Sequence, residues 1–140
     1  MNYYKYEQLE VGMQESFQVT VTEEMIKQFG EITGDFNPLH TDEQFAKQKG
    51  YEGKVVYGML TASFLSALAG MYLPGQRSLI HRVEVEFPKP VYVGDTLTVL
   101  GKIVSMNEAF QIFEMKVTVS NQEQKKVLRG KMRIQVLSEE

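Results

Sequence analysis

Cysteine is absent from the 140-residue sequence, and histidine occurs only twice. Without cysteine, the chain can form no disulfide bond and no iron–sulfur cluster, and it has no thiolate ligand for zinc. A cysteine nucleophile is excluded for the same reason. Two histidines are also too few for a histidine-rich metal site. These absences exclude several classes of metalloprotein and thiol enzyme.

An excess of basic residues is also missing, because 15 lysines and arginines face 18 aspartates and glutamates, which gives a net charge of −3. This balance disfavours a general nucleic-acid-coating protein, and we expect no nucleic acid among the partners. Residues 1–7 lack the apolar core of a secretory signal. We therefore expect a cytoplasmic protein.

Long hydrophobic runs are lacking as well. The longest apolar stretch, residues 59–73, is short for a membrane span and contains the polar residues Thr61, Ser63 and Ser66. Apolar and small residues occupy every side of this stretch when it is drawn as a helix, which is typical of a helix buried on most of its faces. The stretch predicts a buried central helix over 59–72 and no membrane association.

What the chain does contain is an ordinary globular balance, with 43% hydrophobic and 24% charged residues. Its length is close to the roughly 150 residues usual for one domain. A chain of this size buries roughly two-thirds of its unfolded surface, which is enough for one core. Since no linker or repeat is visible, we expect a single domain over residues 1–140.

Apolar and polar residues alternate in five segments, as they do in antiparallel strands with one buried face. The segments are 15–21, 82–87, 96–106, 113–120 and 128–136. Thr22 is placed to cap a helix that ends at 33–34, and a second short helix is predicted over 41–48. These elements predict an α+β fold, in which an antiparallel sheet curls around one very apolar helix.

The segment that points most directly to chemistry is the loop over 35–40. Asp35 and His40 lie five residues apart, and Asn37 between them precedes a proline, which disfavours a helical conformation. A carboxylate beside an imidazole is a familiar acid–base unit, because the carboxylate orients the imidazole or takes a proton while the imidazole handles the other transfer. A capping aspartate beside a solvated histidine is the alternative, and composition alone favours it.

Two further groups belong to the apolar helix. Gly58 lies at its start, where a free backbone N–H is a good donor to an oxygen that develops negative charge. Ser66, about two turns further on, could donate a hydrogen bond into the same cavity. Backbone geometry alone also explains the glycine, and a helical serine commonly bonds back to the preceding turn. The other histidine, His81, is expected in a strand with a local partner.

The stretch from Phe29 to Ala46 resembles the signature of the MaoC-like, (R)-specific enoyl-CoA hydratase group of hot-dog-fold proteins. That signature is an aromatic residue and a short spacer, then Gly-Asp-x-Asn-Pro-aliphatic-His, five residues and a small residue. It runs unbroken here, with residues 34–40 as its centre. The similarity continues through 57–63, 73–75 and 87–95, in the family's order, and covers most of the chain.

The resemblance implies a single hot-dog domain, which is a long central helix wrapped by an antiparallel sheet. It also implies a homodimer or a higher homo-oligomer, with the acyl-thioester tunnel near the subunit interface. Family members add water reversibly to trans-2-enoyl-CoA, by a syn-type addition that gives (R)-3-hydroxyacyl-CoA. The expected partner is an acyl-CoA or acyl-carrier-protein thioester, and the family's reaction requires no metal and no redox cofactor.

Carried over by motif, Asp35 and His40 are the expected catalytic pair, which binds and activates one water. The backbone N–H of Gly58 would hold the thioester oxygen. Ser66 falls at the family's pocket serine, and Asn37 would support the loop through hydrogen bonds. These residues are the site that the resemblance predicts.

One position departs from the family's pattern, because Tyr57 stands where histidine is common. We expect Tyr57 to contact the substrate pocket, where it narrows the pocket or alters a hydrogen bond. Two other functions suit the same fold. A thioesterase is the weaker one, since thioesterases usually lack the Asp-x-Asn-Pro-x-His run. A non-catalytic module that holds acyl-CoA could lose Asp35 or His40 without cost, and the presence of both argues against it.

Overall fold

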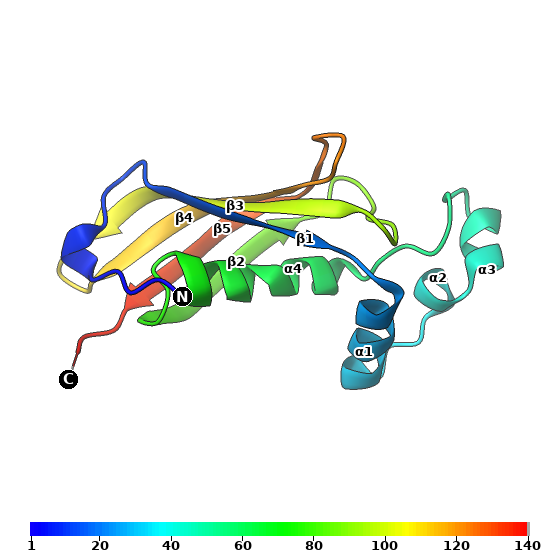
Figure 1. Ribbon diagram of the computed structural model, residues 1–140, viewed down its shortest axis with the longest axis horizontal. Helices are drawn as coiled ribbons and strands as arrows, with labels where there is room; N and C mark the ends of the chain where they lie inside the picture. The colour runs from blue at the N-terminus through cyan, green and yellow to red at the C-terminus, as the bar shows by residue number, and fades with distance from the viewer. Residues whose placement is uncertain (140) are drawn as a thin grey trace.

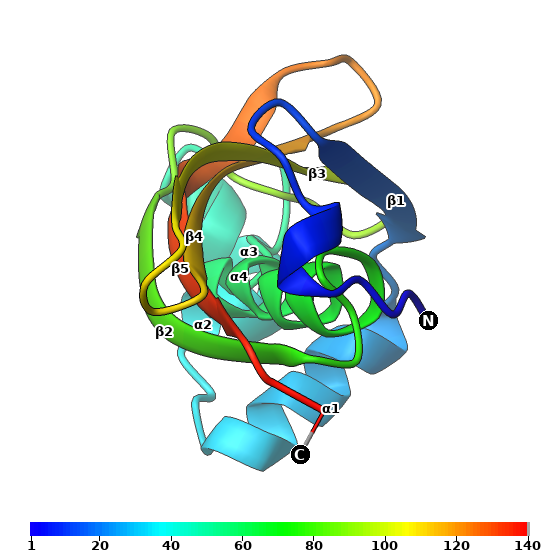
Figure 2. The same ribbon diagram turned by 90° about the vertical axis from the view of Figure 1, so that its left-hand side faces the viewer.

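In the computed structural model, which describes residues 1–139, a five-stranded sheet curls around one central helix (Figure 1 and Figure 2). The strands are β1 (Gln14–Thr20), β2 (Ser78–Glu86), β3 (Thr96–Asn107), β4 (Ile112–Ser120) and β5 (Lys126–Val136). Their order across the sheet is β1-β3-β4-β5-β2, and all neighbours are antiparallel. The last three strands therefore form a central meander, and the first two lie at opposite edges.

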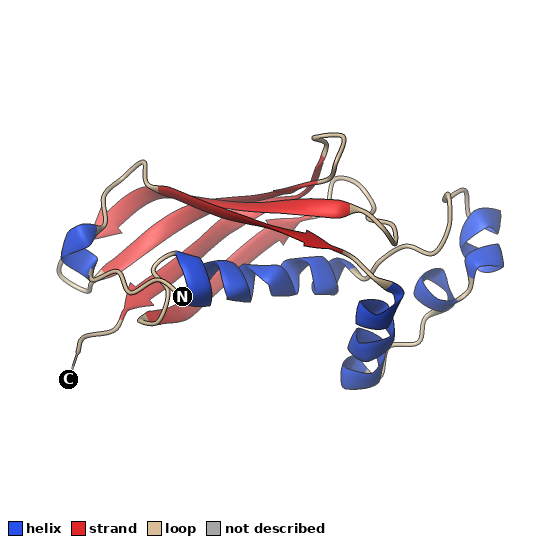
Figure 3. Cartoon of the chain, in the orientation of Figure 1, coloured by secondary structure: helices blue, strands red, loops and turns tan. Residues whose placement is uncertain are grey.

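The α-helices divide into two groups (Figure 3). They are α1 (Glu23–Thr33), α2 (Pro38–Thr41), α3 (Glu43–Gln48) and α4 (Gly58–Ala67), with a short 3-10 helix η1 (Tyr6–Gln8) before β1 and a π-helical turn η2 (Leu68–Tyr72) after α4. α4 runs along the inner face of the sheet, whereas α1, α2 and α3 lie beyond one end of it. None of the described helices is both long and apolar enough to cross a membrane.

The apolar helix predicted over 59–72 corresponds to α4 together with η2. Its inner side, which includes Leu60, Leu65 and Leu68, is buried against the sheet. The burial expected for this helix is incomplete in the single chain, because Met59 and Met71 are exposed on the other side. The sheet covers only one side of the helix, since a five-stranded sheet curls around it without closing.

α1 begins and ends as the sequence predicts. Thr22 Oγ1 accepts a hydrogen bond from the backbone N–H of Met25 at 3.2 Å, which caps the helix. Gly34 ends it in the left-handed conformation, with φ 76°, and its N–H donates to the carbonyl oxygen of Gly30 at 2.8 Å. The chain leaves α1 through this turn directly into the segment that carries Asp35.

The segment predicted as a loop after α1 contains a helical turn, α2. Asn37 Oδ1 accepts a hydrogen bond from the backbone N–H of Leu39 at 3.0 Å, and Pro38 occupies the first helical position, where no N–H is needed. The next helix, α3, begins at Glu43, two residues later than predicted. The reason is that Asp42 caps it, with Oδ1 accepting from a backbone N–H one turn ahead.

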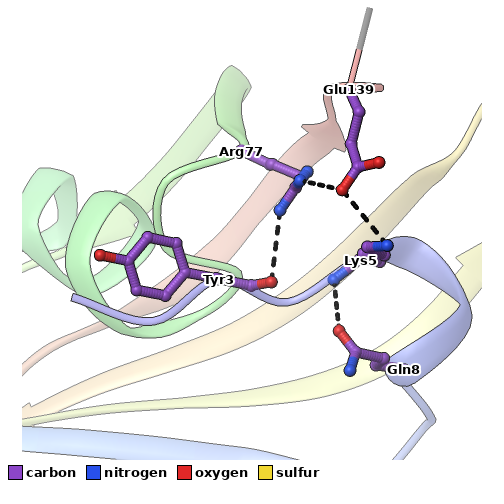
Figure 4. Close-up of polar contacts among 5 residues, drawn as sticks. All are labelled: Tyr3, Lys5, Gln8, Arg77 and Glu139. Carbon is purple, nitrogen blue, oxygen red and sulfur yellow. Dashed lines mark hydrogen bonds and ion pairs between the residues drawn. The ribbon is translucent and has the colours of Figure 1, made fainter.

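Arg77 joins the amino-terminal and carboxy-terminal segments at the end of the sheet remote from α1 (Figure 4). Its Nη1 donates to the carbonyl oxygen of Tyr3 at 3.3 Å, and its Nη2 contacts Glu139 Oε1 at 2.6 Å. Lys5 Nζ reaches the same carboxylate at 3.2 Å, and Lys5 N–H donates to Gln8 Oε1. Ion pairs this exposed contribute little to stability, so they position the two segments more than they stabilise the fold.

Candidate active site

Local hydrogen bonds hold Asp35 and His40 on one turn of chain. Asp35 Oδ1 accepts from the backbone N–H of Asn37 at 3.1 Å, and Asp35 N–H donates to Thr33 Oγ1 at 3.2 Å. The backbone N–H of His40 donates to the carbonyl oxygen of Asn37 at 2.9 Å. Asn37 therefore links the carboxylate on one side to the imidazole on the other, and its own side chain caps α2.

The imidazole of His40 is oriented by a backbone carbonyl. His40 Nδ1 lies 2.6 Å from the oxygen of Val55. A carbonyl oxygen can only accept, so Nδ1 carries a proton and donates it. In the neutral ring, Nε2 then keeps its lone pair and can accept a proton. Val55 is itself held in place, because its N–H donates to Leu39 O at 3.1 Å and it forms an isolated bridge with Tyr92.

Tyr57 contacts both members of the pair. Its ring stacks on the His40 ring with 4.2 Å between centroids, and its hydroxyl donates to the carbonyl oxygen of Asp35 at 2.5 Å. The Phe29 ring lies 5.0 Å away, and a Cβ added to Gly30 would lie only 2.9 Å from the Tyr57 hydroxyl. Tyr57 is 3% exposed. These contacts connect the loop that carries the pair to the start of α4.

Two cavities share His40 and Gly58 as wall residues. The first has a volume of about 390 Å³, and Asp35 and Tyr57 also line it. The second has a volume of about 380 Å³, and its walls include Phe87. Asp35, His40 and the start of α4 therefore border a common space of a size that suits a small molecule.

Gly58 is the first residue of α4, and the side chain of the preceding residue makes no capping hydrogen bond. The first N–H groups of a helix have no partner within that helix, so they are available to a ligand. A Cβ added to Gly58 would lie 3.3 Å from the Phe87 ring. The glycine therefore serves close packing as well as keeping the helix start open.

Ser66 and His81 lie apart from this group. Ser66 is on the exposed side of α4, and within the described chain it lines neither cavity. Its place in the substrate pocket stays a prediction. His81 lies on β2, where its Nε2 is 3.0 Å from Gln135 Oε1 on β5, which confirms a strand residue with a local partner. Within residues 1–139, no three histidine, cysteine, aspartate or glutamate side chains gather closely enough to hold a metal ion.

A family model described as the MaoC like domain matches residues 7–125. The chain belongs to the MaoC-like family. The resemblance seen in the sequence is thereby confirmed, and it extends over most of the chain.

Relatives of this MaoC-like domain include two (R)-specific enoyl-CoA hydratases. The one from Aeromonas caviae is 36% identical over 100 residues, which cover 71% of this chain and 75% of that protein. The one from Rhodospirillum rubrum is 29% identical over 133 residues, or 94% of this chain and 90% of that protein.

Solved structures of two hydratases share the fold. The (R)-hydratase from A. caviae involved in PHA biosynthesis has a TM-score of 0.89 at 30% identity, covering 93% of this chain and 98% of that one. R-hydratase PhaJ1 from Pseudomonas aeruginosa has a TM-score of 0.90 at 28% identity, covering 96% of this chain and 86% of that one. The expected hot-dog fold is therefore confirmed.

Two groups of the MaoC-like site were missed by the sequence analysis. One is the carbonyl oxygen of Val55, which assigns the tautomer of His40. A backbone atom has no residue type of its own, so no motif could have revealed it. The other is Thr61, which lines the second cavity. Its signal was weak, because Thr61 is one of three polar residues in a mostly apolar helix, although it follows Gly58 by only three positions.

The hydroxyl of Tyr57 makes the stability of the domain sensitive to alkaline pH. Burial raises the pKa of Tyr57 above its ordinary value of 10, and the Asp35 carboxylate raises it further. The folded state therefore holds this proton more tightly than the unfolded chain. The resulting stabilisation is complete below pH 10 and is lost as the pH rises through the folded-state pKa. We expect the free energy of unfolding in urea to decline above pH 10, and to decline less in Tyr57→Phe.

Tyr6 contributes a decline of the same sign, because burial and then Glu108 raise its pKa. That contribution is present in both proteins, so the difference between them isolates Tyr57. Identical declines in the wild-type protein and in Tyr57→Phe would contradict the interpretation.

Proposed function

We propose that this MaoC-like domain is a hydro-lyase, which adds water reversibly to trans-2-enoyl-CoA and gives (R)-3-hydroxyacyl-CoA. The observation that carries the proposal is the arrangement of Asp35 and His40 on one cavity wall beside Gly58, with His40 Nδ1 bonded to a carbonyl and Nε2 left as a base. Similarity to two (R)-specific enoyl-CoA hydratases supports the same conclusion.

In the proposed reaction, Asp35 and His40 bind one water molecule. The pair takes a proton from the water as its oxygen bonds to C3, and the π electrons of the C2=C3 bond move toward the thioester oxygen. Gly58 N–H donates to this oxygen while it carries enolate charge. The enolate then returns its electrons, and C2 takes a proton from the pair. One O–H bond and one π bond are exchanged for a C3–O bond and a C2–H bond.

The position of the pair bears on the stereochemistry. Asp35 and His40 lie on one short turn of chain and line the same cavity. A single pair that handles both the water oxygen and the C2 proton delivers them to one face of the double bond, which is a syn-type addition. Asn37 and Tyr57 then act by holding the pair, through the Asn37 backbone and the Tyr57 hydroxyl.

We further propose that the domain is a homodimer. Met59 of α4, at 64% exposed, and Met71 of η2 are apolar residues left uncovered on the outer side of this helical segment, and the open edge strand β2 exposes Leu79 and Val83. A second copy would cover these surfaces and would bring the exposed Ser66 into a pocket between subunits. Light scattering on the purified protein is expected to give twice the 16.0 kDa of one chain, and a monomer mass would refute the dimer.

The test of the proposed function is a hydration assay with crotonyl-CoA. Loss of the enoyl-thioester absorbance, with the (R)-3-hydroxy acid as the product, is the expected result. Release of free thiol would instead indicate a thioesterase. If crotonyl-CoA and longer or carrier-protein-linked enoyl substrates are not turned over while butyryl-CoA still binds, the protein is a non-catalytic acyl-CoA-binding module.

A further inference from the structure

Thr61 carries a buried hydroxyl that the chain does not satisfy. The residue is 1% exposed, and among residues 1–139 its Oγ1 is the buried side-chain N or O atom left without a hydrogen-bond partner. Burying a hydroxyl unpaired destabilises a protein, so nearly all such groups are bonded. An unpaired one beside a cavity therefore points to a partner from outside the chain.

The hydroxyl lies next to the start of α4. Thr61 follows Gly58 by three residues, so the two residues lie on one face of the helix. Helical side chains lean toward the amino-terminal end of their helix, which here is the Gly58 end. Both residues line the same 380 Å³ cavity, together with His40 and Phe87. One helical turn therefore places two residues at the border of this cavity, one with an unpaired hydroxyl and one with a free backbone N–H.

These two donors suit an oxygen atom with partial negative charge. The start of a helix carries a positive partial charge, which favours such an oxygen. The Phe87 ring packs against the backbone of Gly58, so closely that a Cβ added to the glycine would lie 3.3 Å from the nearest ring atom. An apolar ring at this position lowers the local dielectric and strengthens a hydrogen bond made beside it. The matching atom in an enoyl thioester is its carbonyl oxygen, which becomes the enolate oxygen during hydration.

We propose that the Thr61 hydroxyl is a second donor to the thioester oxygen, beside the Gly58 N–H. This inference rests on the proposed function and adds a catalytic residue to it. No bond to Thr61 forms or breaks in the reaction, since the hydroxyl only donates a hydrogen bond that strengthens as charge moves onto the oxygen.

The decisive pair of variants is Thr61→Val and Thr61→Ser. Valine keeps the shape and removes the hydroxyl, whereas serine keeps the hydroxyl. Because oxyanion donors act mainly in the transition state, we expect Thr61→Val to lower kcat by about 10- to 100-fold with little change in KM. Thr61→Ser should keep kcat within about threefold of the wild-type value, by the same reasoning.

Thermal unfolding separates this role from a structural one. Removing an unpaired hydroxyl should raise the Tm of Thr61→Val by about 2–8 °C. A loss of activity together with a higher Tm supports the proposal. An unchanged kcat, or a Tm that falls along with kcat, overturns it, because the hydroxyl then binds only an ordered water or serves the fold.

A measurement without turnover keeps this test apart from the test of the proposed function. Butyryl-CoA has no C2=C3 double bond and therefore cannot be hydrated. A ¹³C label at its thioester carbonyl identifies the infrared band of that group, and this band moves to lower frequency when hydrogen-bond donors bind the oxygen. We expect that shift in the wild-type complex and a smaller shift in Thr61→Val. Failure of the wild-type protein to hydrate enoyl-CoA refutes the proposed function, whereas equal band positions in both complexes refute the role of Thr61.

Discussion

Replacing Asp35 by asparagine, or His40 by glutamine, is expected to lower the rate of crotonyl-CoA hydration by about 10²- to 10⁴-fold. The side-chain amide of either replacement has a similar size but no basic atom, so it cannot take a proton from water. Glutamine at position 40 also has no ring to stack on Tyr57, whereas the native rings lie 4.2 Å apart. The rate of absorbance loss, measured at saturating substrate, reports the effect.

The matched control is His81→Gln, because it makes the same replacement at the other histidine, on β2 and outside the cavities that His40 lines. This variant is expected to hydrate crotonyl-CoA at the wild-type rate. Both site variants should also keep the wild-type circular dichroism spectrum, since neither side chain is buried in the core. A site variant that turns over at a near-native rate would refute the assignment of its residue.

A charge placed in the core between α4 and the sheet is expected to prevent stable folding. Leu65 lies on the inner side of α4 and is 2% exposed. Leu65→Asp would bury a carboxylate among apolar side chains with no partner, and burying an unpaired charge costs more than the roughly 5–15 kcal/mol by which domains are typically stable. The variant is therefore expected to lose its cooperative thermal transition, or to fold only with the carboxylate protonated.

Ile32→Asp is the control for this prediction, because it makes a similar change on α1 at a residue that is 82% exposed. It is expected to unfold within a few degrees of the wild-type protein, as surface substitutions usually do. Circular dichroism during heating compares the two variants. A soluble Leu65→Asp protein with a native melting curve at neutral pH would mean that α4 is not the centre of the core.

Much of the fold follows from local pattern. The strands could be located because apolar and polar residues alternate along them, and Thr22 and Gly34 mark the ends of α1. The start of β2 was predicted at 82 but lies at Ser78, and no residue of this edge strand is buried, so the alternation of its residues does not separate a buried from an exposed face. The helical turn after Asn37 was missed because it is only four residues long, and a single cap decides it. The order of the strands was beyond sequence reasoning as well. The pairing of β1 with β3 joins residues about 80 positions apart, for which no local signal exists.

The site divides in the same way, into residues that the local sequence reveals and contacts that depend on distant parts of the chain. Asp35 and His40 were found because they belong to one short motif, whose spacing survives in the sequence. Their supports come from elsewhere in the chain: the Val55 carbonyl binds His40, and the Tyr57 hydroxyl binds the Asp35 backbone. Thr61 becomes meaningful only when the cavity beside it is known. Residue types identify the reacting groups. The orientation of a side chain, and the lack of a hydrogen-bond partner for it, can be seen only in the packed structure.

The strand order has a consequence for folding during synthesis. The ribosome releases the amino-terminal end first, so β1, the Asp35–His40 turn and α4 are all synthesised before the first residue of β3. Both edge strands must then wait for the central meander, which is complete only at Val136. A nascent chain that stalls before β5 carries its reactive residues and an apolar helix with no core around them. Such a stalled chain is therefore prone to aggregation through its exposed apolar surface.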